Sequence, residues 1–162
     1  MVQKGKQKGY QLEHELARGL KLDSTLQWKI PDAKTLGVPI PHKVPADFII
    51  NSPNGLCFIE CKATAQGNRI PKRNFKPHQI DTARQLPDAY FFVIDFYNGR
   101  QHDIFLIKGD SLAMLYDINT SSITKEEIAN LSYVLHRDTA SKHPDGDGAF
   151  IRGVKDGILK LR

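Results

Sequence analysis

The amino-acid sequence predicts an α/β fold in one domain, with a mixed central β-sheet of about five strands flanked by helices. Three observations lead to this prediction. The chain has 162 residues, which is enough for one domain with a hydrophobic core and leaves little room for a second. Two pairs of apolar runs are separated by turn residues typical of β-hairpins. Helical apolar patterns precede, separate and follow these hairpins, so helices are expected to cover a sheet.

The first helix is predicted over residues 10–20, because Leu12, Leu16 and Leu20 recur at helical spacing and form one apolar face. Residues 1–9 precede it and are rich in Lys, Gly and Gln without apolar anchors. We therefore expect this segment to be a flexible basic arm.

A short strand is predicted at residues 26–30, followed by a long loop over residues 31–45 that contains four prolines. The first hairpin comes next. Its strands are predicted at residues 46–50 and 56–63, because a Ser-Pro-Asn-Gly turn joins the two apolar runs.

Residues 64–76 are interpreted as a polar, basic loop. Pro77 suits the first turn of a helix, which is predicted to run to Leu86. The second hairpin is predicted from strands at residues 89–96 and 102–108, and the nearly continuous apolar character of its first strand indicates a central position in the sheet.

A short helix is predicted at residues 111–116, and Thr124 with Glu127 forms a capping box for another. That second helix is expected to carry four apolar residues, Ile128, Leu131, Val134 and Leu135. We interpret the whole chain, residues 1–162, as a single domain in which residues 117–162 form a C-terminal helical extension with a basic tail.

Charge is distributed unevenly along the chain. There are 23 Lys and Arg residues against 18 Asp and Glu residues, which gives a net charge of +5 and a pI near 9.2. Basic residues are in excess in residues 1–45, in residues 69–84 and in the last thirteen residues, whereas the segments between them are acidic. This pattern suits a protein that binds phosphates at its periphery and keeps carboxylates for another task, although ordinary solvated surfaces remain an alternative.

Two cysteines, Cys57 and Cys61, belong to one predicted strand. Four residues along a strand place their Cα atoms about 13 Å apart, too far for a disulfide, so we expect free thiols and a reducing compartment. No apolar run approaches the ~20 residues that span a bilayer, and no apolar signal core follows the N-terminus. The sequence therefore predicts a cytoplasmic protein without membrane contact.

Three ionisable residues interrupt the apolar strands of the first hairpin: Asp47, Glu60 and Lys62. With the turn centred on Pro53 and Asn54, the two carboxylates face each other across the hairpin. Lys62 then shares the face of Glu60, because side chains alternate along a strand, whereas the side chain of Cys61 points away. A bulge at the turn would shift this pairing by one residue.

Facing carboxylates repel each other, which favours a role as ligands of a divalent cation. Mg²⁺ takes one or two carboxylates and retains several waters, and the carbonyl of Cys61 is a further oxygen ligand. Lys62 beside such a metal is suited to orienting or deprotonating a water, or to stabilising charge on a transition state. A cross-strand ion pair between Lys62 and Asp47 without catalytic purpose is the alternative.

The segment Pro45-Ala46-Asp47, followed after a hairpin by Glu60-Cys61-Lys62, resembles the PD-(D/E)xK nuclease motif, with Ala46 inserted between proline and aspartate. Lys8-Gly9-Tyr10-Gln11-Leu12-Glu13 is similar to the first-helix signature of Holliday junction resolvases of the archaeal Hjc and bacterial RecU types. Asn74-Phe75-Lys76-Pro77-His78-Gln79-Ile80 resembles the RecU segment that carries a glutamine. One departure is the loop before Asp47, which lacks the Ser or Thr of these families near that position.

The resemblance, over roughly residues 4–116, implies a restriction-endonuclease-like core and a homodimer that makes paired nicks in four-way DNA junctions during recombination and repair. It implies Asp47 and Glu60 as metal ligands, Lys62 as the catalytic lysine, Glu13 as an additional acid acting directly or through water, and Gln79 as a residue near the site. The expected cofactor is Mg²⁺, with Mn²⁺ able to substitute.

DNA phosphates are expected to meet the basic residues of the arm and of the loop after the catalytic strand. The candidates are Lys4, Lys6, Lys8, Arg69, Lys72, Arg73, Lys76 and His78. Two other functions stay open: a different PD-(D/E)xK nuclease of the restriction or repair type, and a non-catalytic DNA-binding module.

Overall fold

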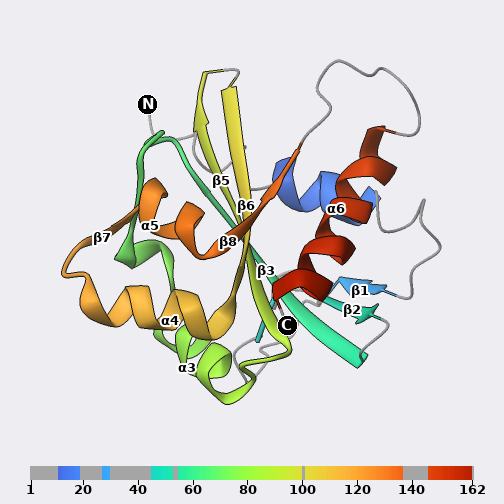
Figure 1. Cartoon of the computed structure of the whole chain (residues 1–162), viewed down its shortest axis with the longest axis horizontal. Helices are drawn as coiled ribbons and strands as arrows, with labels where there is room; N and C mark the ends of the chain where they lie inside the picture. Colours follow the sequence, from blue (N-terminus) through green and yellow to red (C-terminus); the bar gives the residue numbers. More distant parts are fainter. Residues whose placement is uncertain are drawn as a thin grey trace, which may run out of the picture.

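A mixed six-stranded β-sheet forms the centre of the protein, with helices on both of its faces (Figure 1). The computed structural model describes residues 11–18, 27–29, 45–52, 55–99, 101–136 and 146–161. The predicted α/β class with a mixed sheet is confirmed, and the sheet has six strands where about five were expected. The expected basic arm at residues 1–9, with Lys4, Lys6 and Lys8, and most of the proline-rich loop lie outside the described residues.

The strands follow the order β1-β2-β3-β5-β6-β8 across the sheet. Their bounds are β1 Gln27–Lys29, β2 Phe48–Ser52, β3 Gly55–Thr64, β5 Tyr90–Asn98, β6 Gln101–Lys108 and β8 Ser132–Leu135. Neighbours pair antiparallel except β3 and β5, which are parallel and are connected through the helix α3, Pro77–Gln85. Both predicted hairpins are confirmed, and β5 is central and buried as its apolar sequence predicted.

Two hydrophobic clusters cover the two faces of the sheet. Leu12 and Leu16 of the helix at residues 11–18 pack on one face, together with Val154 and Ile158 of the helix α6, Gly146–Leu161. The opposite face is covered by the helices α3, α4 (Gly109–Ile118) and α5 (Lys125–Asn130). Figure 1 shows this three-layer arrangement, with the sheet between the two groups of helices.

The interpretation of residues 64–76 as a loop is wrong. This segment contains the strand β4, Arg69–Pro71, and a short 3₁₀ helix at Lys72–Asn74. β4 pairs antiparallel with β7, Ser122–Thr124, in a separate two-stranded sheet. The polar composition concealed this strand, because Ile70 is the one residue of β4 that is fully buried.

The predicted helix after Thr124 exists but is shorter than expected. The capping box is present, since the Thr124 hydroxyl accepts a hydrogen bond from the Glu127 amide and the Glu127 carboxylate accepts one from the Thr124 amide. The helix ends at Asn130, and the next apolar residues belong to β8. Leu135 is buried and Val134 is exposed, which is the alternation of a strand and not the continuation of a helix.

The C-terminal region is therefore not an extension of the domain. β8 is an edge strand of the central sheet, and α6 packs against β8 and β6. Val154 and Ile158 of α6 are almost fully buried in the core. Both cysteines are free and buried, as expected. Among the described residues, no helix combines the length and apolar character needed to span a membrane.

Two glycines of α6 test how closely this helix packs on the sheet. A Cβ added at Gly157 would lie 2.7 Å from Leu106 Cδ2 and from Tyr133 Cδ1, whereas one at Gly153 would make an ordinary contact of 3.5 Å with Leu135. We expect Gly157→Ala to lower the free energy of unfolding by about 1–2 kcal/mol because of overpacking. Gly153→Ala, the matched control, should raise it by about 0.5–1 kcal/mol through helix propensity. Urea unfolding of both variants measures the difference, and equal effects would contradict close packing of α6.

Candidate active site

The pairing of β2 with β3 places Asp47 beside Glu60. Phe48 pairs with Ile59 and Ser52 with Gly55, so the predicted register without a bulge is confirmed. Asp47 lies in the bend just before β2, where its amide donates to the Ile59 carbonyl at 3.1 Å. Its Oδ2 accepts a hydrogen bond of 2.7 Å from the Cys61 amide. The Asp47 carboxylate is thus fixed to the main chain next to Glu60.

Glu60 is the most buried acid of the site, with 3 % of its surface exposed. Its Oε1 accepts two hydrogen bonds of 2.5 Å, one from Lys62 Nζ and one from Gln79 Nε2. Lys62 and Glu60 therefore share one face of β3, as alternation predicted, while the Cys61 side chain packs in the core of the opposite face. Among the described residues, Oε2 of Glu60 has no hydrogen-bond partner.

Burial dominates the electrostatics of Glu60. Burial, together with the nearby charge of Asp47 and against the ammonium groups of Lys62 and Lys76, raises the pKa of this carboxyl from 4.5 to about 7. Near neutral pH the carboxyl is therefore poised between its protonated and ionised forms. A cation close to its open oxygen would favour the ionised form.

Glu13 lies within electrostatic range of the same group of residues. It projects from the helix at residues 11–18 and is half-buried. Burial raises the pKa of the Cys61 thiol well above its usual value, and the charges of Asp47, Glu13 and Glu60 add to that effect. The fold therefore brings all three candidate acids near Cys61, although Glu13 is 34 residues away from Asp47 in the sequence.

Gln79 links the start of α3 to the site. Pro77 opens this helix, and the amide of Lys76 just before it donates to Gln79 Oε1 at 3.0 Å. The amide nitrogen of the same side chain donates to Glu60, and Gln79 is almost fully buried. Gln79 thereby holds the Glu60 carboxylate in one orientation.

The candidate phosphate-binding residues fall into two groups. Arg69, Arg73 and Lys76 are exposed. Lys72 is directed inward, since its ammonium donates to the Asn119 carbonyl at 2.7 Å and lies 4.2 Å from the centre of the Tyr116 ring. His78 is half-buried on α3. Lys72 therefore contributes to packing, and a phosphate contact stays a prediction for the exposed residues.

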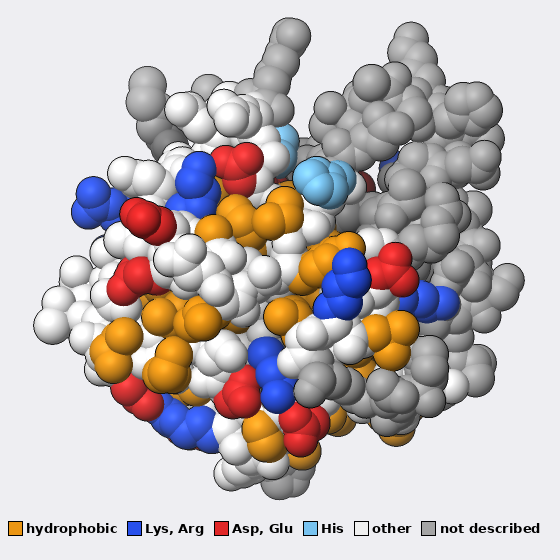
Figure 2. Space-filling model, in the orientation of Figure 1, with side chains coloured by type: hydrophobic (Ala, Val, Ile, Leu, Met, Phe, Trp, Pro, Cys, Tyr) orange, Lys and Arg blue, Asp and Glu red, His pale blue; other side chains and the backbone are white. Residues whose placement is uncertain are grey.

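Surface charge does not by itself mark a path for DNA on the face shown in Figure 2. The acidic and basic side chains drawn there are intermingled, with apolar side chains between them. The exposed ion pair of Arg84 with Asp81 and Asp117 illustrates the mixing. Charge in the sequence segments 69–84 and 117–149 is thus partly neutralised between elements.

Tyr90 is a site residue that the sequence analysis missed. Its hydroxyl donates to the carbonyl of Pro45, which fixes the chain just before Asp47. Burial raises the pKa of Tyr90 well above its usual value, and the charges of Glu60 and Asp47 raise it further, so the hydroxyl remains a donor. The only signal in the sequence was a tyrosine at the start of a buried strand, which predicts packing alone.

The donor set fits a hard divalent cation. It offers the carboxylates of Asp47 and Glu60 and the main-chain carbonyl of Cys61, all oxygen ligands, and Glu60 Oε2 is a buried acceptor without a hydrogen bond among the described residues. In that part of the chain no three His, Cys, Asp or Glu side chains form a closed metal cage. An open site with two acids suits Mg²⁺, which retains several waters.

The chain matches no model of a known protein family, and no curated protein is similar to it at a significant level.

The raised pKa of Glu60 predicts a dependence of stability on pH. The folded protein holds the proton up to about pH 7, whereas the unfolded chain releases it near 4.5. The contribution of this group to stability is therefore complete below 4.5 and is lost as the pH rises to about 7. Between about pH 5 and pH 8 the free energy of unfolding of the wild type should fall by roughly 1–3 kcal/mol because of this group, and Glu60→Gln should lack this decrease. Urea unfolding in EDTA measures the difference.

Glu126→Gln, at an exposed position on α5, is the control for this measurement. It should follow the wild-type pH profile. If Glu60→Gln also kept the wild-type slope, the Glu60 carboxyl would titrate normally and the assignment of its raised pKa would be wrong.

Proposed function

We propose that this protein is a Mg²⁺-dependent DNA endonuclease with a restriction-endonuclease-like core. The observation that carries the proposal is the arrangement of Asp47, Glu60 and Lys62 just before β2 and in β3. The two carboxylates are adjacent there, and Glu60 Oε2 accepts no hydrogen bond from the described residues. Two adjacent acids beside a lysine lower the stability of the folded state, because burial disfavours the ionised form of Glu60. A purely structural role for this arrangement is therefore unfavourable.

Asp47, Glu60 and the carbonyl of Cys61 would hold the metal, with Glu13 as an additional acid. When bound, Mg²⁺ supplies Lewis acidity toward a phosphate oxygen and lowers the pKa of a coordinated water. Mn²⁺, which also prefers oxygen ligands, is expected to substitute.

Lys62 has three N–H donors on a side chain that is 12 % exposed, and it reaches the site from the same strand face as Glu60. Its ammonium is placed to donate to the phosphate oxygens on which negative charge develops, or to orient the attacking water. Gln79 fixes the Glu60 carboxylate from the other side, so the acid and the lysine keep their relative positions.

The proposed substrate is a four-way DNA junction, cut by a homodimer. Support comes from the resemblance of the first-helix segment around Glu13 and of the Gln79 segment to Holliday junction resolvases, together with the electrostatic proximity of Glu13 to Asp47 and Glu60. Each chain carries one candidate site, so paired nicks in two strands require two copies.

The short ion pair between Lys62 and Glu60 favours one other candidate, a DNA-binding module in which these charges only pair. The two functions differ in metal dependence. A binding module would bind DNA with or without Mg²⁺ and would leave every phosphodiester intact.

We expect purified protein with Mg²⁺ to make symmetric nicks in end-labelled four-way junctions. Asp47→Ala and Lys62→Ala should each lower the cleavage rate by about 10²–10⁴-fold while DNA binding persists. The matched controls Asp117→Ala and Lys108→Ala, away from the site, should cleave like the wild type. Linear duplex and flap DNA in the same assay identify a nuclease of another specificity, and no cleavage of any substrate would contradict the proposal.

Metal binding is testable without catalysis. Mg²⁺ at about ten times its Kd should add roughly 1.4 kcal/mol to the free energy of unfolding, seen as a rise in Tm. Asp47→Asn keeps an acceptor for the Cys61 amide but loses the charge, so its Tm should not respond to Mg²⁺. Asp117→Asn should respond like the wild type, and an unchanged response in Asp47→Asn would exclude this carboxylate as a ligand.

A further inference from the structure

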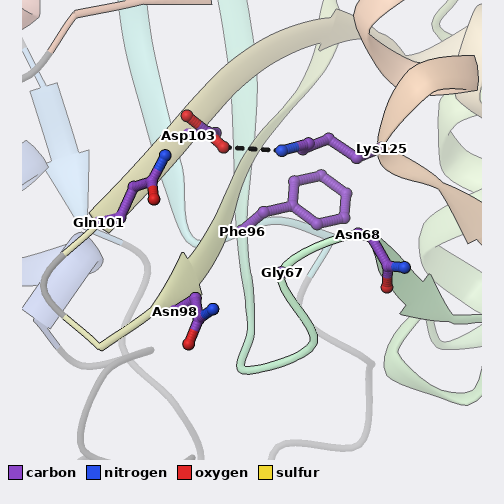
Figure 3. Close-up of a pocket in the computed structure, with 7 residues that line it drawn as sticks. All are labelled: Gly67, Asn68, Phe96, Asn98, Gln101, Asp103 and Lys125. Atoms are coloured by element: carbon purple, nitrogen blue, oxygen red, sulfur yellow. Dashed lines mark hydrogen bonds and ion pairs between the residues drawn. The ribbon is translucent and has the colours of Figure 1, made fainter.

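A second feature of the described structure is a pocket of about 310 Å³ at the end of the β5–β6 hairpin. Figure 3 shows Asn98 and Gln101 on the hairpin and Asn68 on the turn that connects β3 with β4, all three of which line the pocket. Phe96 and the ion pair of Asp103 with Lys125 also line the pocket. The volume is at the lower end of the ~300–1,000 Å³ typical of ligand pockets, so it suits a small group.

Main-chain contacts hold the walls of this pocket in place. The amide of Lys125 donates to the Asn68 carbonyl at 2.9 Å, which joins the turn to the start of α5. The Thr64 hydroxyl accepts from the amide of Gln66 at 3.2 Å within the same turn. A Cβ added at Gly67 would lie 3.4 Å from Asn98 Cβ, so the turn and the hairpin are in close contact. The pocket is therefore a preformed feature of the backbone.

The polar groups of the pocket are available to a ligand. Within the described residues, the side-chain amides of Asn68, Asn98 and Gln101 have no hydrogen-bond partner, and each offers both donors and an acceptor. Asp103 Oδ2 accepts from Lys125 Nζ at 2.8 Å, so Lys125, the one cation that the described residues contribute to the lining, is already neutralised. Phe96 adds an apolar wall. The described lining therefore offers a phosphate little net positive charge, whereas the edge of a planar heterocycle matches the amides.

The sheet register places the pocket on the same face as the candidate catalytic groups. Lys62 pairs with Ile94, and two residues further along both strands Thr64 pairs with Phe96. Phe96 is opposite Asp103 and Asn98 is opposite Gln101, so the pocket residues continue the row that contains Lys62. Asn98 and Gln101 lie four residues along the strands from the row of Lys62, which corresponds to about 13 Å, roughly two nucleotides of an extended DNA strand.

We infer that this pocket receives an unpaired nucleobase of the DNA, from a nucleotide about two positions from the scissile phosphate. The inference rests on the proposed nuclease function and adds to it a site that reads the base. Amide side chains bind base edges through paired donors and acceptors, and a base that leaves the stack is held against aromatic or apolar side chains. Branch points of DNA supply bases that unstack at lower cost than those within a duplex.

The test uses four-way junctions in which the second nucleotide on either side of the mapped cleavage position carries each of the four bases or an abasic site. We expect the wild type to cleave the preferred base about 10-fold faster than the abasic junction, the discrimination typical of one good base contact. Gln101→Ala and Asn68→Ala should reduce this ratio to about 2-fold or less, with the rate on the abasic junction unchanged. Gln85→Ala and Asn130→Ala, which remove the same amides outside the pocket, should keep the wild-type ratio.

A binding measurement separates the inference from the nuclease activity. Lys62→Ala is mixed with a set of junctions that carry 2-aminopurine at one of the nucleotides around the branch point. We expect a fluorescence change at one of these positions, and we expect the change to disappear in the double variant Lys62→Ala/Gln101→Ala. Equal cleavage of base-containing and abasic junctions, or pocket variants that slow all substrates equally, would overturn the inference and leave the nuclease standing. If no junction is cleaved, the proposed function fails, and the fluorescence measurement still tests base binding by the pocket. A fluorescence change that is lost with Gln101→Ala supports base binding, and the absence of any change overturns it.

Discussion

The register of the β2–β3 hairpin determines where every charged group of the candidate site lies. Because Ser52 pairs with Gly55, Asp47 reaches the main chain at Cys61 and stands next to Glu60. A shift by one residue would place Glu60 and Lys62 on the opposite face, among the apolar side chains that surround Cys61. The strand β3 also pairs with the buried strand β5, so the register of the hairpin is fixed from both sides.

The buried position of Glu60 has an energetic cost that the surrounding sheet offsets. A carboxyl with 3 % exposure is held by Lys62 and Gln79, which both donate to Oε1, while no described residue donates to Oε2. Beside it, β5 contributes eight consecutive buried residues, 90–97. Each fully buried aliphatic or aromatic side chain stabilises the folded state by about 1.5–3 kcal/mol, so burial of a few residues of β5 offsets the cost of burying the Glu60 carboxyl.

Local pattern predicted most of what surrounds the candidate site. The turn after Ser52 and the alternation in residues 56–63 were sufficient to pair Asp47 with Glu60, because a short hairpin connects residues that are close in sequence. The position of Gln79 followed from a resemblance, and its hydrogen bond to Glu60 agrees with that position. These features depend on contacts over fewer than twenty residues.

Long-range pairing explains the failures. β8 was taken for a helix, because Ile128, Leu131 and Leu135 also fit helical spacing and only pairing with β6 selects the strand. β4 was hidden since its partner, β7, lies about fifty residues later in the chain. Tyr90 and the amide-lined pocket come from segments that meet only in the folded sheet, and no local pattern marks them.

The two faces of the sheet are covered by helices from different parts of the chain. Three helices, α3, α4 and α5, cover the face that carries Glu60 and Lys62. Val154 and Ile158 of α6 help to cover the opposite face, which contains Cys57 and Cys61. A local opening that released α6 from β8 and β6 would therefore expose the thiol face to oxidants while the helices over Glu60 and Lys62 stayed in place.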